Sequence, residues 1–271
     1  MNSNGKLIHF AEAYLTVGQK ETEREHIERT LAHFEEVLRG QLGSTLLDIR
    51  LFGSYTRNTV LPRQYDPQSD VDILVVWDWQ NKPEKPGNLR KRLLDILENA
   101  YPDALSQSDF PAVKLTFKHI KFDLVPALPI ASHWANPQYH IPGPNDSWIV
   151  TTPTILKADL DYALSDSPNH PVLNVIRLMK YWNGTQGYPL PSYYLEEQVI
   201  STFHKQNVIE GLVYALSHVY YWYQCIPYNL WDATVQQQLG ALLLDKPPKQ
   251  GDEAIWTWLV EHLPALSEVE D

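Results

Sequence analysis

The stretch LFGSYTRNTVLPRQYDPQSDVDILVVW, residues 51–77, places two aspartates in an otherwise apolar strand. A glycine–serine pair, Gly53 and Ser54, precedes a polar loop, and Asp70 and Asp72 then alternate with aliphatic residues. Alternate side chains of a strand share a face, so the two carboxylates are expected roughly 6.5–7 Å apart along the backbone. Such a pair repels unless a cation lies between, and Mg²⁺ favours carboxylate oxygens. The plainer alternative is that Asp70 caps a turn and Asp72 is a solvated strand residue.

A third acidic residue favours the metal site over the plainer alternative. The segment IKFDLVPAL, residues 120–128, sets Asp123 in another apolar strand, with Phe122 and Leu124 on the opposite face. Three carboxylates on adjacent strands form the arrangement that two-metal phosphoryl transfer needs. The glycine ahead of them lets backbone N–H groups approach a phosphate, and the serine hydroxyl adds a donor. The sequence therefore predicts a Mg²⁺ or Mn²⁺ site that acts on a phosphate ester.

Composition describes a folded protein that handles small ligands. The chain has 271 residues, is 44% hydrophobic and carries 9 Trp and 15 Tyr, which is incompatible with a disordered chain. Its net charge of −11 disfavours a stable complex with long nucleic acid, because phosphate neutralisation supplies most of that affinity. No apolar run is long enough for a membrane span, and the N-terminus lacks the features of a signal peptide. The single cysteine, Cys225, is expected as a buried, inert thiol. We expect a soluble, cytoplasmic protein with no membrane partner.

The pattern of apolar residues divides the chain into a mixed half and a helical half. In the first half, the pattern predicts a long N-terminal helix at residues 5–41, a strand that runs into the glycine turn at residues 46–55, and a strand that carries the two aspartates at residues 69–79. A short helix at residues 88–102, a hairpin at residues 112–128 and a long loop at residues 133–148 follow. The second half predicts helices at residues 152–165, 170–184, 192–205, 207–225 and 254–264. The expected fold class is α+β, with domains at residues 1–152 and 153–271.

Several of these motifs resemble a known family. GSYTRNTVLPRQYDPQSDVDILV (residues 53–75) and the later IKFDLVPA (residues 120–127) resemble the signature of polymerase-β-like nucleotidyltransferases. Within that superfamily they are most similar to the bacterial cGAS/DncV-like enzymes (CD-NTases) and to oligoadenylate synthetases. VLNVIRLMKYWNG and LPSYYLEEQVI (residues 172–184 and 190–200) resemble the helical-domain motif of the same group. The resemblance covers roughly residues 5–205. It implies a mixed-sheet palm domain facing a C-terminal helical domain across a nucleotide cleft.

Residue roles follow from the resemblance position by position. It makes Asp70 and Asp72 ligands of the catalytic metals, and Asp123 a third metal-site carboxylate that lies near the attacking hydroxyl. The triphosphate would be held by residues from both halves, namely Gly53, Ser54, Lys180 and Ser192, while Tyr193 would stack on the base. Two plainer alternatives remain: Lys180 as a helix-face lysine with its amine in solvent, and Ser192 as a helix N-cap.

The resemblance implies an ATP-binding enzyme that joins nucleoside triphosphates, as donor and acceptor, into a cyclic or short oligonucleotide second messenger in antiphage signalling. Pyrophosphate would be released, and a regulatory protein is a candidate partner. Two alternatives stay open: nucleotidyl transfer to a linear oligomer, an RNA end, a protein or a small molecule, and a nucleotide-binding scaffold without catalysis. The segment at residues 229–259 departs from the family pattern, so the bases used and the product stay undetermined.

Overall fold

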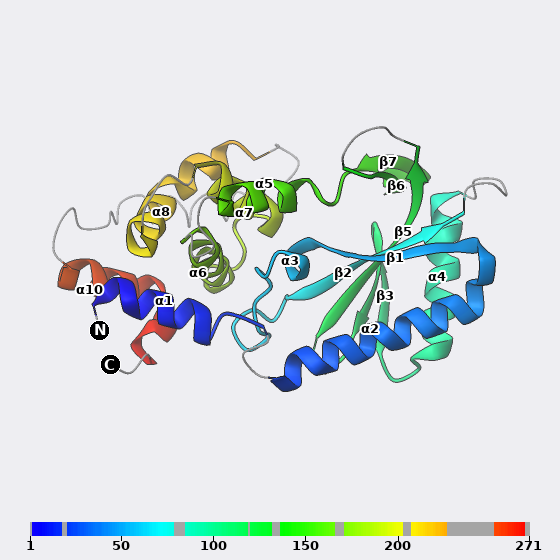
Figure 1. Cartoon of the computed structure of the whole chain (residues 1–271), viewed down its shortest axis with the longest axis horizontal. Coiled ribbons are helices and arrows are strands. Elements are labelled where there is room, and N and C mark those ends of the chain that lie inside the picture. Colours follow the sequence, from blue (N-terminus) through cyan, green and yellow to red (C-terminus); the bar gives the residue numbers. More distant parts are fainter. Residues whose placement is uncertain are drawn as a thin grey trace. The chain divides into compact units, whose positions relative to one another are not determined.

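The computed structural model describes residues 2–17, 21–78, 85–118, 120–131, 136–165, 171–202, 207–226 and 252–268. The chain forms two compact units (Figure 1). The helical unit comprises Met1–Gln19, Gln64–Asp66 and Asp159–Asp271, and the sheet unit comprises Lys20–Arg63 and Pro67–Ala158. These units differ from the expected domains, residues 1–152 and 153–271, because the N-terminal residues belong to the helical unit.

The sheet unit is built on a mixed sheet. Its main strands lie in the order β1 (Leu46–Phe52), β2 (Asp70–Trp77), β5 (Lys121–Ile130), β4 (Ala112–Thr116) and β3 (Leu105–Asp109). β2 and β5 pair in parallel, whereas β1–β2, β4–β5 and β3–β4 are antiparallel. This arrangement confirms the expected α+β class and the hairpin that joins β4 to β5.

One face of the sheet is covered by α2 (Glu21–Leu42) and α4 (Pro86–Ala100), which lie along it in Figure 1. α4 buries Leu89, Leu93 and Leu97, which recur every fourth residue and so form one stripe of the helix. On α2, Phe34 meets the ring of Phe122 from β5 with centroids 5.0 Å apart. The residues beside Asp123 on β5 therefore anchor the core under the helices, which leaves Asp123 on the opposite face.

The other face of the sheet changes character along the strands. Leu74 and Val76 of β2 and Val125 and Ala127 of β5 belong to an apolar cluster that includes Tyr139. Tyr139 comes from β6 (Gln138–Gly143), which pairs with β5 and with β7 (Ser147–Thr151). This face is therefore apolar where β6 joins the sheet and acidic where β2 begins.

The segment expected to be a long loop, residues 133–148, instead contains β6 and the start of β7. A short 3-10 turn, Pro144–Asp146, joins the two strands. Asn145 and Asp146 have φ values of 55° and 58°, the left-handed pair that tight hairpin turns require and that Asn and Asp tolerate. Pro142 and Gly143 are rare inside strands, so the sequence of β6 does not predict one. The edge strand β3 was also missed, since LSQSD has a single apolar residue.

The prediction of one long helix at residues 5–41 is wrong, because the structure forms two separate helices, α1 and α2, in this segment. α1 (Ser3–Ala13) begins at the cap residue Asn2, whose side chain accepts from the Gly5 N–H, and ends at Tyr14. Leu15 then turns into the core, where it is fully buried. α1 belongs to the helical unit and α2 to the sheet unit.

The helical unit is organised around α6 (Val172–Thr185), which is buried along most of its length and contacts α1, α7 (Ser192–Thr202) and α8 (Val208–Gln224). The other elements of this half are α5 (Ile155–Leu164), α10 (Asp252–His262) and the 3-10 helix η4 (Pro264–Glu268). The helices predicted for the second half are therefore confirmed. Across the part of the chain that the structure describes, no helix has the length and apolar character needed to cross a membrane.

A short strap of the helical unit, residues 64–66, comes from the loop that leads into β2. The ring of Tyr65 lies edge-on to Phe10 and to Tyr181, with centroids 6.0 Å and 5.9 Å apart. The buried carboxylate of Asp66 accepts a hydrogen bond from the Tyr188 hydroxyl at 2.7 Å. The strap thus packs with helices far away in sequence, four residues before Asp70 begins β2.

Candidate active site

Asp70, Asp72 and Asp123 converge on one face of the sheet. Asp70 and Asp72 open β2, and Asp123 lies directly opposite Asp72 in the parallel pairing of β2 with β5. Each residue offers a carboxylate oxygen, and these oxygens all lie within 4.8 Å of one another. The three side chains are half-buried. A group of convergent, partly exposed carboxylates is a donor set suited to hard divalent cations.

The strand alternation explains how an apolar core accommodates these acids. Val71 and Ile73 of β2 and Phe122 and Leu124 of β5 are fully buried on the helix-covered face. Their alternation with the aspartates leaves the carboxylates on the other face, beyond the apolar cluster around Tyr139. The same two strands therefore supply both the core and the acidic site.

Lys114 is a site residue that the sequence analysis did not find. It pairs with Asp123 across β4 and β5, and its Nζ lies 3.7 Å from Asp123 Oδ2. Its position between the buried Val113 and Leu115 was the available signal, because alternation places it on the face of the acids. With one lysine beside three aspartates, the local charge is still negative, which favours a divalent cation.

The glycine turn lies against the acidic group. Gly53 follows the last residue of β1 and has a φ of +69°, a conformation that favours glycine. A Cβ at this position would overlap Asp72 Oδ2 and lie 2.7 Å from Asp72 Cγ. The turn continues into α3 (Gly53–Thr56), where the Ser54 carbonyl accepts from the Thr59 N–H at 3.0 Å. The absence of a side chain at Gly53 is what lets backbone and carboxylate meet.

The phosphate-binding residues expected on the helical half lie together on α6 and α7. Lys180 is 5% exposed, and its Nζ donates to Glu196 Oε1 at 3.2 Å. Glu196 lies one turn after Ser192, which is the exposed first residue of α7, and Tyr193 beside it is 49% exposed. Glu196 was missed from the sequence, where it stands in a run of two glutamates that a helix surface would also explain.

The expectation for the single cysteine is wrong. Cys225 was expected to be buried and is exposed, because it follows the last turn of α8 instead of entering the core. Of the aromatics before it, Trp222 and Tyr223 are buried but Tyr221 is 64% exposed. Most of the segment at 229–259, which departs from the family pattern, lies outside the described residues.

Two features together define the class of protein. The mixed sheet brings three carboxylates from two parallel strands to a glycine turn, and a separate helical unit follows in the chain. This architecture is the one expected of polymerase-β-like nucleotidyltransferases, and the three carboxylates fit a divalent metal ion.

The family follows from the comparison with protein-family models. Residues 1–161 match the model for the Second Messenger Oligonucleotide or Dinucleotide Synthetase domain (SMODS), and the chain belongs to this family. It is therefore a nucleotidyltransferase that makes oligonucleotide or dinucleotide second messengers, and the group of three aspartates fits a divalent metal ion. No curated protein matches the sequence.

Solved structures show the same fold over nearly the whole chain. Escherichia coli MS115-1 CdnC with ATP is 16% identical with a TM-score of 0.66, covering 100% of this chain and 99% of that chain. The same enzyme has been solved in a CdnC:HORMA-deltaN complex, at 16% identity and a TM-score of 0.63 over 97% of each chain. The Bradyrhizobium diazoefficiens CD-NTase CdnG with GTP is 12% identical with a TM-score of 0.67, over 97% and 99% of the two chains. Elizabethkingia meningoseptica CdnE cyclic dinucleotide synthase, with GTP and Apcpp, is 17% identical with a TM-score of 0.61, over 95% and 98%.

Proposed function

We propose that this enzyme joins nucleoside triphosphates into a cyclic or short oligonucleotide in a Mg²⁺-dependent reaction, as a signal in cellular defence against phage. The convergence of Asp70, Asp72 and Asp123 carries the proposal, because three carboxylates within 4.8 Å fit the metal site of nucleotidyl transfer. In the reaction, a hydroxyl oxygen of the acceptor nucleotide bonds to the α-phosphorus of the donor. The bond from that phosphorus to the bridging oxygen breaks, and pyrophosphate leaves.

The three aspartates have distinct proposed tasks. Asp70 and Asp72 would each hold Mg²⁺ (or Mn²⁺), and Asp123 would share in the same site. When bound, the ions neutralise charge on the α-phosphate and on the leaving pyrophosphate. Asp123 would also accept the proton of the attacking hydroxyl, with Lys114 at 3.7 Å holding its carboxylate in place.

Residues on both units are proposed to bind the triphosphate. At the glycine turn, Gly53 would present its backbone N–H and Ser54 its hydroxyl, which bonds to no residue in the described part of the chain. On the helical unit, an ammonium has three donors, so the bond from Lys180 to Glu196 leaves donors for a phosphate oxygen. The exposed positions of Ser192 and Tyr193 support contacts with a phosphate and a base.

A small nucleotide acceptor is favoured over a long RNA or DNA acceptor. The net charge of −11 opposes the phosphate contacts that hold long nucleic acid. Transfer to a protein or a small molecule remains the alternative reaction of the same site. A regulatory protein is the proposed partner, since the similar enzyme CdnC has been solved in a CdnC:HORMA-deltaN complex.

The test is incubation of the full chain with all four radiolabelled NTPs and Mg²⁺ or Mn²⁺, followed by separation of the products with and without phosphatase. We expect a phosphatase-resistant product that requires metal and is lost in Asp70→Asn/Asp72→Asn. Asp95→Asn, an exposed acid on α4, is the matched control and should keep full activity. A phosphatase-sensitive ladder would favour linear oligomers, and no product from nucleotides alone would favour another acceptor or a requirement for the partner protein. A product that forms equally well with Asp70→Asn/Asp72→Asn would contradict the proposal.

A further inference from the structure

A cavity of about 660 Å³ lies in the sheet unit, away from the residues of the proposed active site. Three parts of the chain line it. These are Arg63, residues 100–105 at and after the end of α4, and residues 116–118 at and after the end of β4. Its volume is in the range of small-molecule sites. Phe117 in its wall packs against Phe122 with ring centroids 5.8 Å apart, and therefore belongs to the face of the sheet opposite Asp123.

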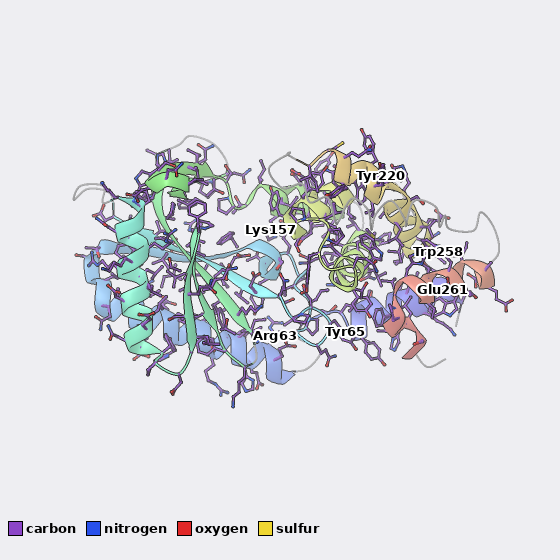
Figure 2. The ribbon with its side chains drawn as sticks, turned by 180° about the vertical axis from the view of Figure 1, so that it is seen from behind. Arg63, Tyr65, Lys157, Tyr220, Trp258 and Glu261 are labelled. Carbon is purple, nitrogen blue, oxygen red and sulfur yellow. The ribbon has the colours of Figure 1, made fainter. Side chains whose placement is uncertain are left out.

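Arg63 is one of the polar groups that line this cavity, and Figure 2 labels it beside the sheet. Its Nη1 donates to the Phe117 carbonyl at 2.7 Å and to the Lys118 carbonyl at 3.4 Å. These bonds fix the guanidinium while using only one of its three nitrogens. In the chain as described, the donors on Nε and Nη2 meet no protein acceptor. An arginine fixed in this way is a preorganised receptor for a bidentate anion.

The charge around the cavity reinforces this reading. Lys118 is exposed, and no carboxylate in the described ranges lies within ion-pair distance of it or of Arg63. Asp103 also lines the cavity and contributes the opposing charge. Two cations against one carboxylate make the cavity locally positive in a chain whose net charge is −11. Such a local excess attracts a small anion.

Aromatic rings form the apolar part of the wall. Tyr101 lies edge-on to Phe117, with centroids 5.6 Å apart, and its hydroxyl is 2.9 Å from His33 Nδ1. Burial, with a smaller contribution from Glu36, raises the pKa of Tyr101 to about 12, so the ring stays neutral. Cationic and aromatic groups in one cavity suit a ligand that combines an anionic group with a flat ring.

We propose that this cavity is a second ligand site that binds a phosphorylated small molecule of nucleotide size. Arg63 and Lys118 hold the phosphate, and Phe117 and Tyr101 contact the apolar part. The site is separate from the three aspartates, and its ligand is not a substrate in the step that they catalyse.

The wall of the cavity is connected to the proposed active site by strand pairing at the start of β5. Thr116, in the cavity wall, pairs with Lys121, which in turn pairs with Asp70, and Asp123 follows two residues later. A ligand that binds Arg63 and Lys118 therefore contacts the turn that leads into β5, the strand that carries Asp123 and pairs with β2 at Asp70. Regulation of synthesis by this ligand rests on the proposed function, whereas binding itself does not.

The test is hydrogen exchange and calorimetry on the full chain in EDTA, with ATP, GTP and pyrophosphate as probes. We expect at least one probe to slow exchange at residues 103–105 and 116–118, and Lys118→Gln and Arg63→Gln to weaken its binding by about tenfold or more. Arg63→Lys, which keeps the charge without the fork, should also weaken it. Arg39→Gln is the matched control, because Arg39 is an exposed cation of the sheet unit that pairs with Glu35 on α2.

Two results would overturn the proposal: no slowed exchange at these segments with any probe, or wild-type affinity in Lys118→Gln. Lys118 makes no side-chain bond among the described residues, so Lys118→Gln keeps the test valid if Arg63→Gln fails to fold. The readout needs no turnover. A protein that binds the probe at this cavity, but whose product forms equally well with Asp70→Asn/Asp72→Asn, would contradict the proposed function and leave this inference standing.

Discussion

At the scale of single residues, the acids of β2 and β5 are costly to the fold until a cation joins them. Asp70, Asp72 and Asp123 bring like charges within 4.8 Å, and Lys114 reaches Asp123 from 3.7 Å away. Like charges at such distances repel, most strongly where side chains are partly removed from water. Acidic side chains that lie close together at a cost in stability are typical of binding sites for cations.

This repulsion predicts opposite effects on stability with and without metal. In EDTA, Asp72→Asn should melt at or above the temperature of the wild type, because one charge of the cluster is removed. Millimolar Mg²⁺ should raise the melting temperature of the wild type and leave that of Asp72→Asn nearly unchanged, since only the wild type holds the ion in its folded state. Differential scanning calorimetry measures both. Equal stabilisation of the two proteins by Mg²⁺ would show that the ion binds elsewhere.

Gly53 carries a second prediction at this scale. Alanine at a φ of +69° is strained, and its Cβ would overlap the Asp72 carboxylate. Gly53→Ala should lower the free energy of unfolding by about 2 kcal/mol or more, measured by denaturant titration. The control is Gly40→Ala in α2, where a Cβ meets nothing within 4 Å, and which should raise it by about 0.5–1 kcal/mol. Equal effects at the two positions would refute the close approach of Gly53 to Asp72.

Sequence reasoning found these residues because a strand has a strict two-residue period. Acids at alternate positions of an apolar strand must share one face, and Gly53 belongs to the same sequence motif, 17 residues before Asp70. Lys114 was missed because its role depends on which strand lies beside β5, and register between strands is not a local property. Glu196 was missed for the same reason, as its partner lies on another helix.

At the scale of secondary-structure elements, α6 and α7 are joined by a buried ion pair. The Lys180 and Glu196 side chains are 5% and 1% exposed, and the two charged atoms lie 3.2 Å apart. Breaking one side of such a pair leaves an uncompensated charge in the core, whereas neutralising both sides costs far less. Substituting both members of the pair can therefore distinguish a structural role of Lys180 from a role in nucleotide binding.

A double-mutant cycle makes this separation. Lys180→Met should lower the free energy of unfolding by about 3–5 kcal/mol, and adding Glu196→Gln should recover most of that loss. If Lys180 also contacts the triphosphate, the double variant should still show a KM for NTP at least about tenfold above the wild type. Chemical denaturation and steady-state kinetics give the two readouts. A stable double variant with an unchanged KM would assign Lys180 to structure alone.

The elements that were mispredicted share a physical cause. The helical pattern before residue 42 is real on both sides of the break, but the turn after Ala13 is decided by Leu15 entering a core made of distant residues. The β6–β7 hairpin depends on the left-handed turn at Asn145 and Asp146 and on pairing with β5. Tertiary contacts decided both, and a single sequence does not display them.

At the scale of the whole molecule, charge limits what the enzyme holds. A net charge of −11 disfavours the many phosphate contacts that hold a long duplex, although a small triphosphate can be bound by a few donors. We expect no stable complex with a 50-base-pair DNA or RNA duplex at physiological salt in fluorescence anisotropy. A single NTP with Mg²⁺ should bind in the same buffer. A duplex that binds tightly, with affinity falling steeply as salt rises, would contradict this view of the surface.

The division into two compact units was visible in the sequence as a change from mixed to helical patterns. The assignment of α1 and the strap at residues 64–66 to the helical unit was not visible, because it depends on Tyr65 meeting Phe10 and Tyr181. α1 precedes α6 by more than a hundred residues, and Tyr65 lies far in sequence from both Phe10 and Tyr181. Long-range packing of this kind carries no local signature.

The central claim is that Asp70, Asp72 and Asp123 hold the metal that acts on the nucleotide. The most direct measurement is a crystal structure of the protein with Mn²⁺ and a non-hydrolysable triphosphate, using the anomalous signal to locate the ions. We predict anomalous peaks about 2.1 Å from carboxylate oxygens of the three aspartates, with the triphosphate as a further ligand. Peaks at other residues, or a triphosphate bound away from this face of the sheet, would contradict the account.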